Sequence, residues 1–197
     1  MEGILKMNKL LFAALIALSC EPTHVSIPEQ DTAPQEDSRN WVTWDVCGHN
    51  VDENPCNFVL ADQNGKEIEL YDFYGKVIVI DFSTMWCTVC VNIASEGDKL
   101  IAKYGAERVV WLTVLIENES GEAPDRSDLQ RWVVTHSIMA PVLGGDRSFI
   151  DMSATTGYPI TGWPTIVVIN QKMVLKRGIS GWSEQAIMAW VDELLQT

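Results

Sequence analysis

The stretch KVIVIDFSTMWCTVC, residues 76–90, decides the fold of this chain. Residues 76–82 form an apolar run typical of a buried strand, and a helical pattern follows the cysteines over residues 91–104. Cys87 and Cys90 therefore share the first turn of a helix, where their sulfurs can approach each other. The first sulfur lies among unsatisfied backbone N–H groups at the positive end of the helix dipole, which stabilises a thiolate. This arrangement predicts redox or metal chemistry at the two cysteines.

Length and charge limit the classes of protein that the chain can represent. Its 197 residues suffice for one domain with a full hydrophobic core and a tail. The net charge of −13 and the isoelectric point near 4.5 argue against nucleic-acid binding, which needs a basic surface. We therefore expect no nucleic-acid partner.

Residues 1–19 have the pattern of a lipoprotein-type signal peptide. Lys6 and Lys9 precede an apolar run, residues 10–18, that is too short to span a bilayer. The run ends in ALSC, which resembles a bacterial lipobox, although the position three before the cysteine is usually Leu and is Ala here. The resemblance implies a lipid on Cys20 and an exported, membrane-anchored protein that faces the periplasm or the cell exterior. The alternative is an ordinary cleaved signal with an incidental Cys20.

Residues 20–40 have the composition of a tether. They contain three prolines and five carboxylates and almost no apolar side chains. Such a segment cannot bury enough apolar surface to offset its conformational entropy, so we expect it to be disordered. A tether behind a lipidated cysteine would hold a folded domain, residues 41–197, away from the membrane surface.

The sequence of the folded part alternates between strand and helix patterns. A strand over residues 57–61 and its partner over 67–70 flank Asn64-Gly65, a strong hairpin signal, and a short turn follows over 71–75. Further strands are predicted over residues 108–116, 141–143, 165–169 and 172–176, with a helix capped by Ser127 that ends near His136, a short helix over 149–156 and a last helix capped by Ser183. This order predicts an α/β fold with a mixed central sheet flanked by helices and an N-terminal β-hairpin.

The same order, with Trp86 and the two cysteines after the first central strand, resembles the thioredoxin fold. Asp81 lies six residues before Cys87, where thioredoxins carry a buried acid, and Trp163-Pro164-Thr165 precedes a strand in the manner of their cis-proline loop. The hairpin and the turn before the central strand resemble redoxins of the TlpA/ResA type, which are exported thiol–disulfide oxidoreductases tethered to membranes. The resemblance covers residues 57–195, and it implies a thioredoxin-like domain.

Each residue of the motif would then have a chemical role. Cys87, the more exposed sulfur, would attack a substrate disulfide, and Cys90 would resolve the mixed disulfide within the protein. Burial should raise the pKa of Asp81, which could then accept the proton of Cys90 at neutral pH. Pro164 should follow a cis peptide bond. In the family this loop faces the cysteines, so Trp163, Thr165 and Trp86 are candidate substrate-binding residues.

Each of these residues also has a structural alternative. A lone C-x-x-C could be half a zinc site, but the sequence offers no second cysteine pair or close histidine pair, so no metal is expected. Asp81 could be a salt-bridged structural acid, although its apolar flanks favour the functional role. Pro164 could be an ordinary trans proline at a strand start. The redox-active disulfide between Cys87 and Cys90 would be the only redox group, without a further cofactor.

Cys47 and Cys56 form a separate pair at the head of the folded domain. In an oxidising compartment such a pair is most simply a structural disulfide that closes a short loop. On the chain-entropy model a loop of this size stabilises the fold by roughly 2–3 kcal/mol. A relay of electrons from this pair to Cys87 and Cys90 is conceivable, but no feature of the sequence supports it.

These observations predict a thiol–disulfide oxidoreductase that exchanges electrons with protein thiols and disulfides and with an upstream electron donor. We expect the protein to be monomeric and to reduce disulfides in cell-envelope proteins. The direction follows from the spacer Thr88-Val89, which brings no cation that would stabilise the thiolate of a strong oxidant. One alternative is a thiol peroxidase, since Thr84 lies three residues before Cys87, although the proline of the peroxidase motif is missing. Another is a copper chaperone, although its relatives usually space the cysteines C-x-x-x-C and add a distal histidine.

Overall fold

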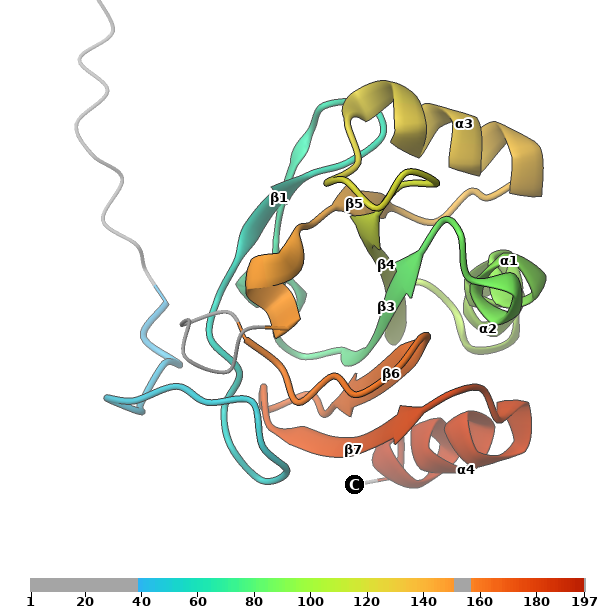
Figure 1. Cartoon of the computed structure of the whole chain (residues 1–197). Helices are drawn as coiled ribbons and strands as arrows, with labels where there is room; N and C mark the ends of the chain where they lie inside the picture. The colour runs from blue at the N-terminus through green and yellow to red at the C-terminus, as the bar shows by residue number, and fades with distance from the viewer. Residues whose placement is uncertain (1–38, 151–156, 197) are drawn as a thin grey trace, which may run out of the picture. The chain divides into compact units, whose positions relative to one another are not determined.

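The computed structural model describes residues 39–150 and 157–196, and the described residues from Thr43 onward belong to one compact unit. A five-stranded sheet forms its centre, in the order β5-β4-β3-β6-β7 (Figure 1). The strands are β3 (Val77–Thr84), β4 (Val109–Glu117), β5 (Val142–Gly144), β6 (Thr165–Ile169) and β7 (Leu175–Ser180). The strands β3, β4 and β5 are parallel, whereas β6 runs antiparallel to β3 and β7 antiparallel to β6. This mixed sheet is that of the thioredoxin fold, as the order of elements predicted.

The α-helices bury the face of the sheet to which the odd-numbered residues of β3 point. They are α1 (Thr88–Ile93), α2 (Glu96–Tyr104), α3 (Arg126–His136) and α4 (Glu184–Leu194). Val77 and Val79 of β3 pack in one apolar cluster with Ile93 of α1, Leu100 of α2 and Val191 of α4. Since side chains alternate along a strand, Asp81 continues this row toward the end of β3 where α1 begins.

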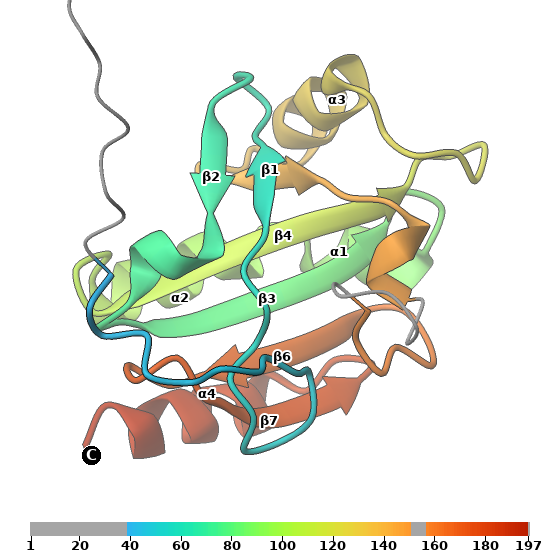
Figure 2. The same ribbon diagram turned by 90° about the vertical axis from the view of Figure 1, so that its left-hand side faces the viewer.

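A hairpin and two 3-10 turns lie over the opposite face, as Figure 2 shows for β1 and β2. The elements are β1 (Val59–Ala61), β2 (Glu67–Glu69), η1 (Leu70–Phe73) and η2 (Arg147–Ile150). Aromatic rings join this layer to the sheet: Phe82 of β3 lies 4.6 Å from the ring of Tyr158 and 5.8 Å from that of Phe149, between ring centroids. The hairpin turn places Gly65 at a φ of 81°, which explains the Asn-Gly signal.

The structure corrects the prediction of one helix after the cysteines. Residues 91–104 do not form a continuous helix, because α1 ends at Ile93 and α2 begins at Glu96. The break at Ala94 and Ser95 lets Ala94 pack in a second apolar cluster with Leu129 of α3. Apolar periodicity alone did not show this change of direction.

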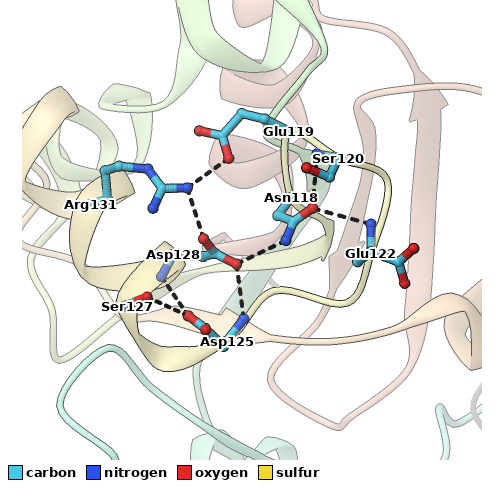
Figure 3. A network of polar contacts seen from close by, with 8 residues as sticks. All are labelled: Asn118, Glu119, Ser120, Glu122, Asp125, Ser127, Asp128 and Arg131. Carbon is cyan, nitrogen blue, oxygen red and sulfur yellow. Dashed lines mark hydrogen bonds and ion pairs between the residues drawn. The ribbon is translucent and has the colours of Figure 1, made fainter.

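The start of α3 is also corrected. The helix is capped by Asp125 rather than by Ser127, in a capping box in which the side chains of Asp125 and Asp128 each accept a backbone N–H of the other residue. Figure 3 shows how Asn118 and Arg131 donate further hydrogen bonds to Asp128. Burial opposes the charge of Asp128, but these bonds outweigh it and lower its pKa.

Two further element boundaries differ from the predictions. The last strand was expected over residues 172–176, but β7 spans Leu175–Ser180, because residues 170–173 form the turn that precedes it. The short helix predicted over residues 149–156 begins earlier, as η2, and its second half lies outside the described residues.

Candidate active site at the end of β3

The two cysteines lie where β3 passes into α1. Cys87 is the N-cap of α1, and its sulfur accepts the backbone N–H of Cys90 at 3.2 Å. The structure joins the two residues in a disulfide, with their Cα atoms 5.2 Å apart. Cys87 is 8% exposed and Cys90 is fully buried, so Cys87 is the sulfur nearer to solvent. The neighbouring Trp86 is 49% exposed and forms part of the rim of the site.

Asp81 is a buried acid on the same face of the sheet as α1. It is 1% exposed, and two hydroxyls bind its carboxylate: Ser83 Oγ donates to Oδ1 at 2.6 Å, and Thr113 Oγ1 donates to Oδ2 at 3.4 Å. Burial raises the pKa of Asp81 to about 7, and the two hydroxyls act in the opposite direction without cancelling that effect. The carboxyl group can therefore take up or release a proton near neutral pH.

The loop before β6 reaches the same end of the sheet. The peptide bond between Trp163 and Pro164 is cis. In the antiparallel pair of β3 and β6, Thr165 lies opposite Phe82, so Pro164 comes beside Ser83, next to the strand end that carries the cysteines. Thr165 is buried, and its hydroxyl donates to the carbonyl oxygen of Gly162 at 2.7 Å, which fixes the shape of the loop.

Glu117 is a site residue that the sequence reasoning missed. It ends β4, is 6% exposed, and accepts the indole N–H of Trp86 at 2.8 Å through Oε2. Its other oxygen forms an ion pair with Arg147 of η2. The signal was present in the sequence: Glu117 is the one charged residue at the end of a continuous apolar strand. A carboxylate there holds Trp86 beside Cys87.

Two clefts flank the cis-proline loop. One, of about 270 Å³, is lined by Arg147, Ile150, Ile160, Thr161, Gly162 and Trp163. The other, of about 290 Å³, includes Thr165 and lies over β6 and β7 beside the loop that carries His49. Trp163 and Thr165, the two candidate substrate-binding residues of the loop, therefore each line a cleft.

Cys47 and Cys56 are joined in a disulfide, with Cα atoms 4.8 Å apart. Within their loop, the ring of His49 accepts the backbone N–H of Cys56 and lies 4.0 Å from that of Tyr158, between ring centroids. Burial lowers the pKa of His49. Two backbone hydrogen bonds tie the same loop to Leu175, the first residue of β7: the N–H of Asp52 donates to the carbonyl of Leu175, and the N–H of Leu175 donates to the carbonyl of Glu53. The disulfide thus closes a loop that is hydrogen-bonded to the edge strand β7 of the sheet.

Some expectations fall outside the part of the chain that the structure describes. The predicted signal peptide, Cys20 and the predicted tether up to residue 38 lie there. Across residues 39–150 and 157–196, no helix has the length and apolar character needed to cross a membrane. Within the same ranges, no group of three or more histidine, cysteine or acidic side chains could hold a metal ion.

A model of the AhpC/TSA family matches residues 51–177 of this chain. Similar proteins include the thiol-disulfide oxidoreductases ResA of Halalkalibacterium halodurans and of Bacillus subtilis, each 26% identical to it. The first alignment covers 71% of this chain and 74% of the relative, and the second covers 67% and 68%.

Solved structures share the fold. The exposed lipoprotein thioredoxin of Streptococcus pneumoniae has a TM-score of 0.57 and 26% identity, with 71% of this chain and 100% of that chain covered. A thiol:disulfide interchange protein of the thioredoxin family from Chlorobium tepidum has a TM-score of 0.60 and 18% identity, with 75% and 99% covered.

Proposed function

Because this chain belongs to the AhpC/TSA family and is a thiol–disulfide oxidoreductase of the ResA type, we propose that Cys87 and Cys90 are its redox-active pair and Asp81 its proton acceptor. The observation that carries the proposal is the position of Asp81. This buried acid lies on the face of the sheet that α1 covers, on the strand that leads into the cysteines. A buried acid with a pKa near 7 suits proton transfer at neutral pH.

The first step is attack by the thiolate of Cys87 on one sulfur of a substrate disulfide. A new S–S bond joins Cys87 to the substrate, the substrate S–S bond breaks, and the second substrate sulfur leaves as a thiolate that takes a proton from solvent. Cys87 suits this role because it is the more exposed of the two cysteines. The backbone N–H of Cys90 donates to its sulfur and would stabilise the thiolate.

The second step releases the substrate. Asp81 as carboxylate takes the proton of the Cys90 thiol, directly or through water, and the Cys90 thiolate attacks the sulfur of Cys87. The bond between Cys87 and the substrate breaks, the disulfide between Cys87 and Cys90 forms, and the substrate leaves reduced at both sulfurs. The two electrons come from the enzyme dithiol, so the reaction needs no cofactor beyond the cysteine pair. An upstream thiol donor must then reduce the enzyme disulfide.

The substrate polypeptide would lie between Trp86 and the cis-proline loop. Trp86 is half exposed and fixed by Glu117, and Trp163 lines one of the clefts beside the loop. Pro164 has no N–H to donate, so backbone contacts to the substrate would come from its neighbours. Aromatic side chains on both sides of the cysteines would select an extended segment around the substrate disulfide.

We further propose that the protein is a monomeric reductant of disulfides in exported proteins, anchored to a membrane through a lipid on Cys20. The lipoprotein-type pattern of residues 1–20 supports the anchor, as does the similarity to an exposed lipoprotein thioredoxin. The uncharged spacer Thr88-Val89 supports a reductant, since neither of its side chains is a cation that could stabilise the thiolate of Cys87. Equilibration of the purified protein with glutathione buffers tests the direction: a reductant has a potential below that of the glutathione pool.

Two cysteine variants test the assignment of the active pair. With a protein disulfide as substrate, Cys87→Ser should abolish reduction, and Cys90→Ser should accumulate a mixed disulfide with the substrate that a non-reducing gel separates. The double variant Cys47→Ser and Cys56→Ser is the matched control and should retain the rate. Reduction by Cys87→Ser at the rate of the unaltered protein would exclude the proposal.

A second candidate, a thiol peroxidase, is favoured by one observation. The hydroxyl of Thr84, three residues before Cys87, is buried and has no hydrogen-bond partner within the described residues. A peroxide bound at Cys87 could use such a donor. Stopped-flow mixing of the reduced protein with hydrogen peroxide separates the two activities: a peroxidase consumes peroxide much faster than it reduces a protein disulfide.

A further inference from the structure

The hydroxyl of Thr113, near the active site, is oriented by its two hydrogen-bond partners. Thr113 Oγ1 accepts the indole N–H of Trp111 at 3.0 Å and lies 3.4 Å from Oδ2 of Asp81. A hydroxyl has a single hydrogen to donate, so accepting from Trp111 leaves that hydrogen free to point at the carboxylate. All three side chains are buried.

The indole at the start of this chain of hydrogen bonds is held in place by two neighbours. A Cβ added at Gly97 of α2 would lie 2.4 Å from ring atoms of Trp111, so only glycine leaves room for the indole there. The ring of Trp182 is a second neighbour of the indole, 6.1 Å away between centroids and at an interplanar angle of 69°. Trp111 therefore keeps one orientation, and its N–H stays aimed at Thr113.

We infer that Trp111 and Thr113 are positioning residues that stabilise the carboxylate form of Asp81 and so set the pH at which the cysteine pair can resolve a mixed disulfide. The inference rests on the role of Asp81 in the proposed function. The positioning residues lie outside the cysteine motif: the indole of Trp111 on β4 orients the hydroxyl of Thr113, and this hydroxyl contacts Asp81. Ser83, on β3 itself, supplies the other hydrogen bond to the same carboxylate.

Among the residues that the structure describes, no charged side chain contributes to the pKa shift of Asp81. Its pKa responds to burial, to Ser83 and to Thr113, in that order. Across the sheet, the residue opposite Asp81 on β6 is the apolar Ile166. From the helix layer, Cys87 and Cys90 of α1 are the titratable groups that come into play once the disulfide is reduced. Removing a hydroxyl should therefore change the titration of Asp81 directly.

The rate of the resolving step against pH tests the inference. Reduced protein mixed with Ellman's reagent forms a mixed disulfide at Cys87, and the attack of Cys90 then releases a second thionitrobenzoate, which stopped-flow absorbance follows. Thr113→Val keeps the shape of the side chain and loses the hydroxyl, so the inflection of this rate should move up by roughly 0.5 to 1 pH unit. Thr113→Ser should restore the original inflection. An inflection that moves equally in Thr113→Ser and Thr113→Val would overturn the inference, and an unchanged inflection in Thr113→Val would overturn it where the titration of Asp81 itself is also unchanged.

A second pair of variants isolates the indole. Trp111→Phe keeps an aromatic ring and removes the N–H, so the inflection should move in the same direction as in Thr113→Val and by less, because the hydroxyl remains but is no longer oriented. Trp182→Phe is the matched control, since it alters the ring next to Trp111 and leaves both hydrogen bonds in place; it should not move the inflection. Equal shifts in both tryptophan variants would mean that packing, not the N–H, is responsible.

A measurement independent of turnover separates the inference from the proposed function. Carbon-13 NMR of the aspartate carboxyls, with the Asp81 signal assigned through its loss in Asp81→Asn, gives the titration of this group itself. A higher midpoint in Thr113→Val supports the positioning role even if the resolving rate does not follow it, and that combination would instead refute proton transfer by Asp81. An unchanged midpoint refutes the positioning role, whatever the kinetics.

Discussion

Replacing Asp81 by Asn should stabilise the protein at alkaline pH and should make little difference at acid pH. In the unfolded chain the carboxyl group loses its proton near its usual pKa of 3.8, whereas in the folded protein burial raises this pKa to about 7. Between these two values the folded protein holds a proton that the unfolded chain has released, so its stability falls as the pH rises. The pKa difference of about 3 units, at 1.36 kcal/mol each, corresponds to about 4 kcal/mol above pH 7.

Urea unfolding of the oxidised protein, followed by far-ultraviolet circular dichroism from pH 4 to pH 8, measures this effect. The quantity to compare is the difference in unfolding free energy between Asp81→Asn and the unaltered protein. The amide that Asp81→Asn places among the hydroxyls of Ser83 and Thr113 adds a cost that does not depend on pH. This cost cancels when the difference at pH 4 is subtracted from the difference at pH 8. Asp128→Asn is the control: the pKa of Asp128 is lowered, so the stability that its carboxylate adds is fully present above pH 4 and is lost only below this range, and the difference for Asp128→Asn should stay constant from pH 4 to pH 8. If the difference for Asp81→Asn stays constant across this range, the reasoning about its buried charge is refuted.

Three further changes test the packing around the site by the same unfolding assay at pH 7. Removing the disulfide with Cys47→Ser and Cys56→Ser should cost roughly 2–3 kcal/mol through the entropy of the unfolded chain, and an unchanged midpoint would show that the loop adds no constraint. Gly97→Ala should cost about 1–3 kcal/mol because its Cβ would overlap the ring of Trp111, although alanine favours a helix; a stabilised variant would contradict this packing. Asp125→Ala should cost about 1 kcal/mol through loss of the α3 cap, with no effect on disulfide reduction.

The elements that the sequence predicted well have periodic apolar patterns and clear end signals. The continuous apolar runs around Val79 and Val110 are β3 and β4, which are buried on both faces. Ser183 caps α4 as expected, with its side chain accepting the N–H of Ala186. The candidate site was found through the resemblance of C-x-x-C and Asp81 to the thioredoxin motif, and its chemistry stays a prediction.

What the sequence did not reveal depends on contacts between distant segments. The break between α1 and α2 goes together with the packing of Ala94 against Leu129 of α3, a helix that begins more than thirty residues later. Glu117 reaches Trp86 only because β3 and β4 are paired side by side, with a register shift at their ends. The hydrogen bonds of Thr113 require the same pairing. The pattern of residues within one segment does not show which side chains from distant segments it will contact.

The described residues contain four of the five cysteines, and they are joined in chain order, Cys47 to Cys56 and Cys87 to Cys90. Four cysteines allow three pairings, and only this one joins the first to the second and the third to the fourth. A chain that crosses a membrane from its N-terminus, as we propose for this protein, presents its cysteines to an oxidising compartment in that order. Each pair could then close before the next cysteine arrives, so oxidative folding of this protein would need no disulfide isomerase.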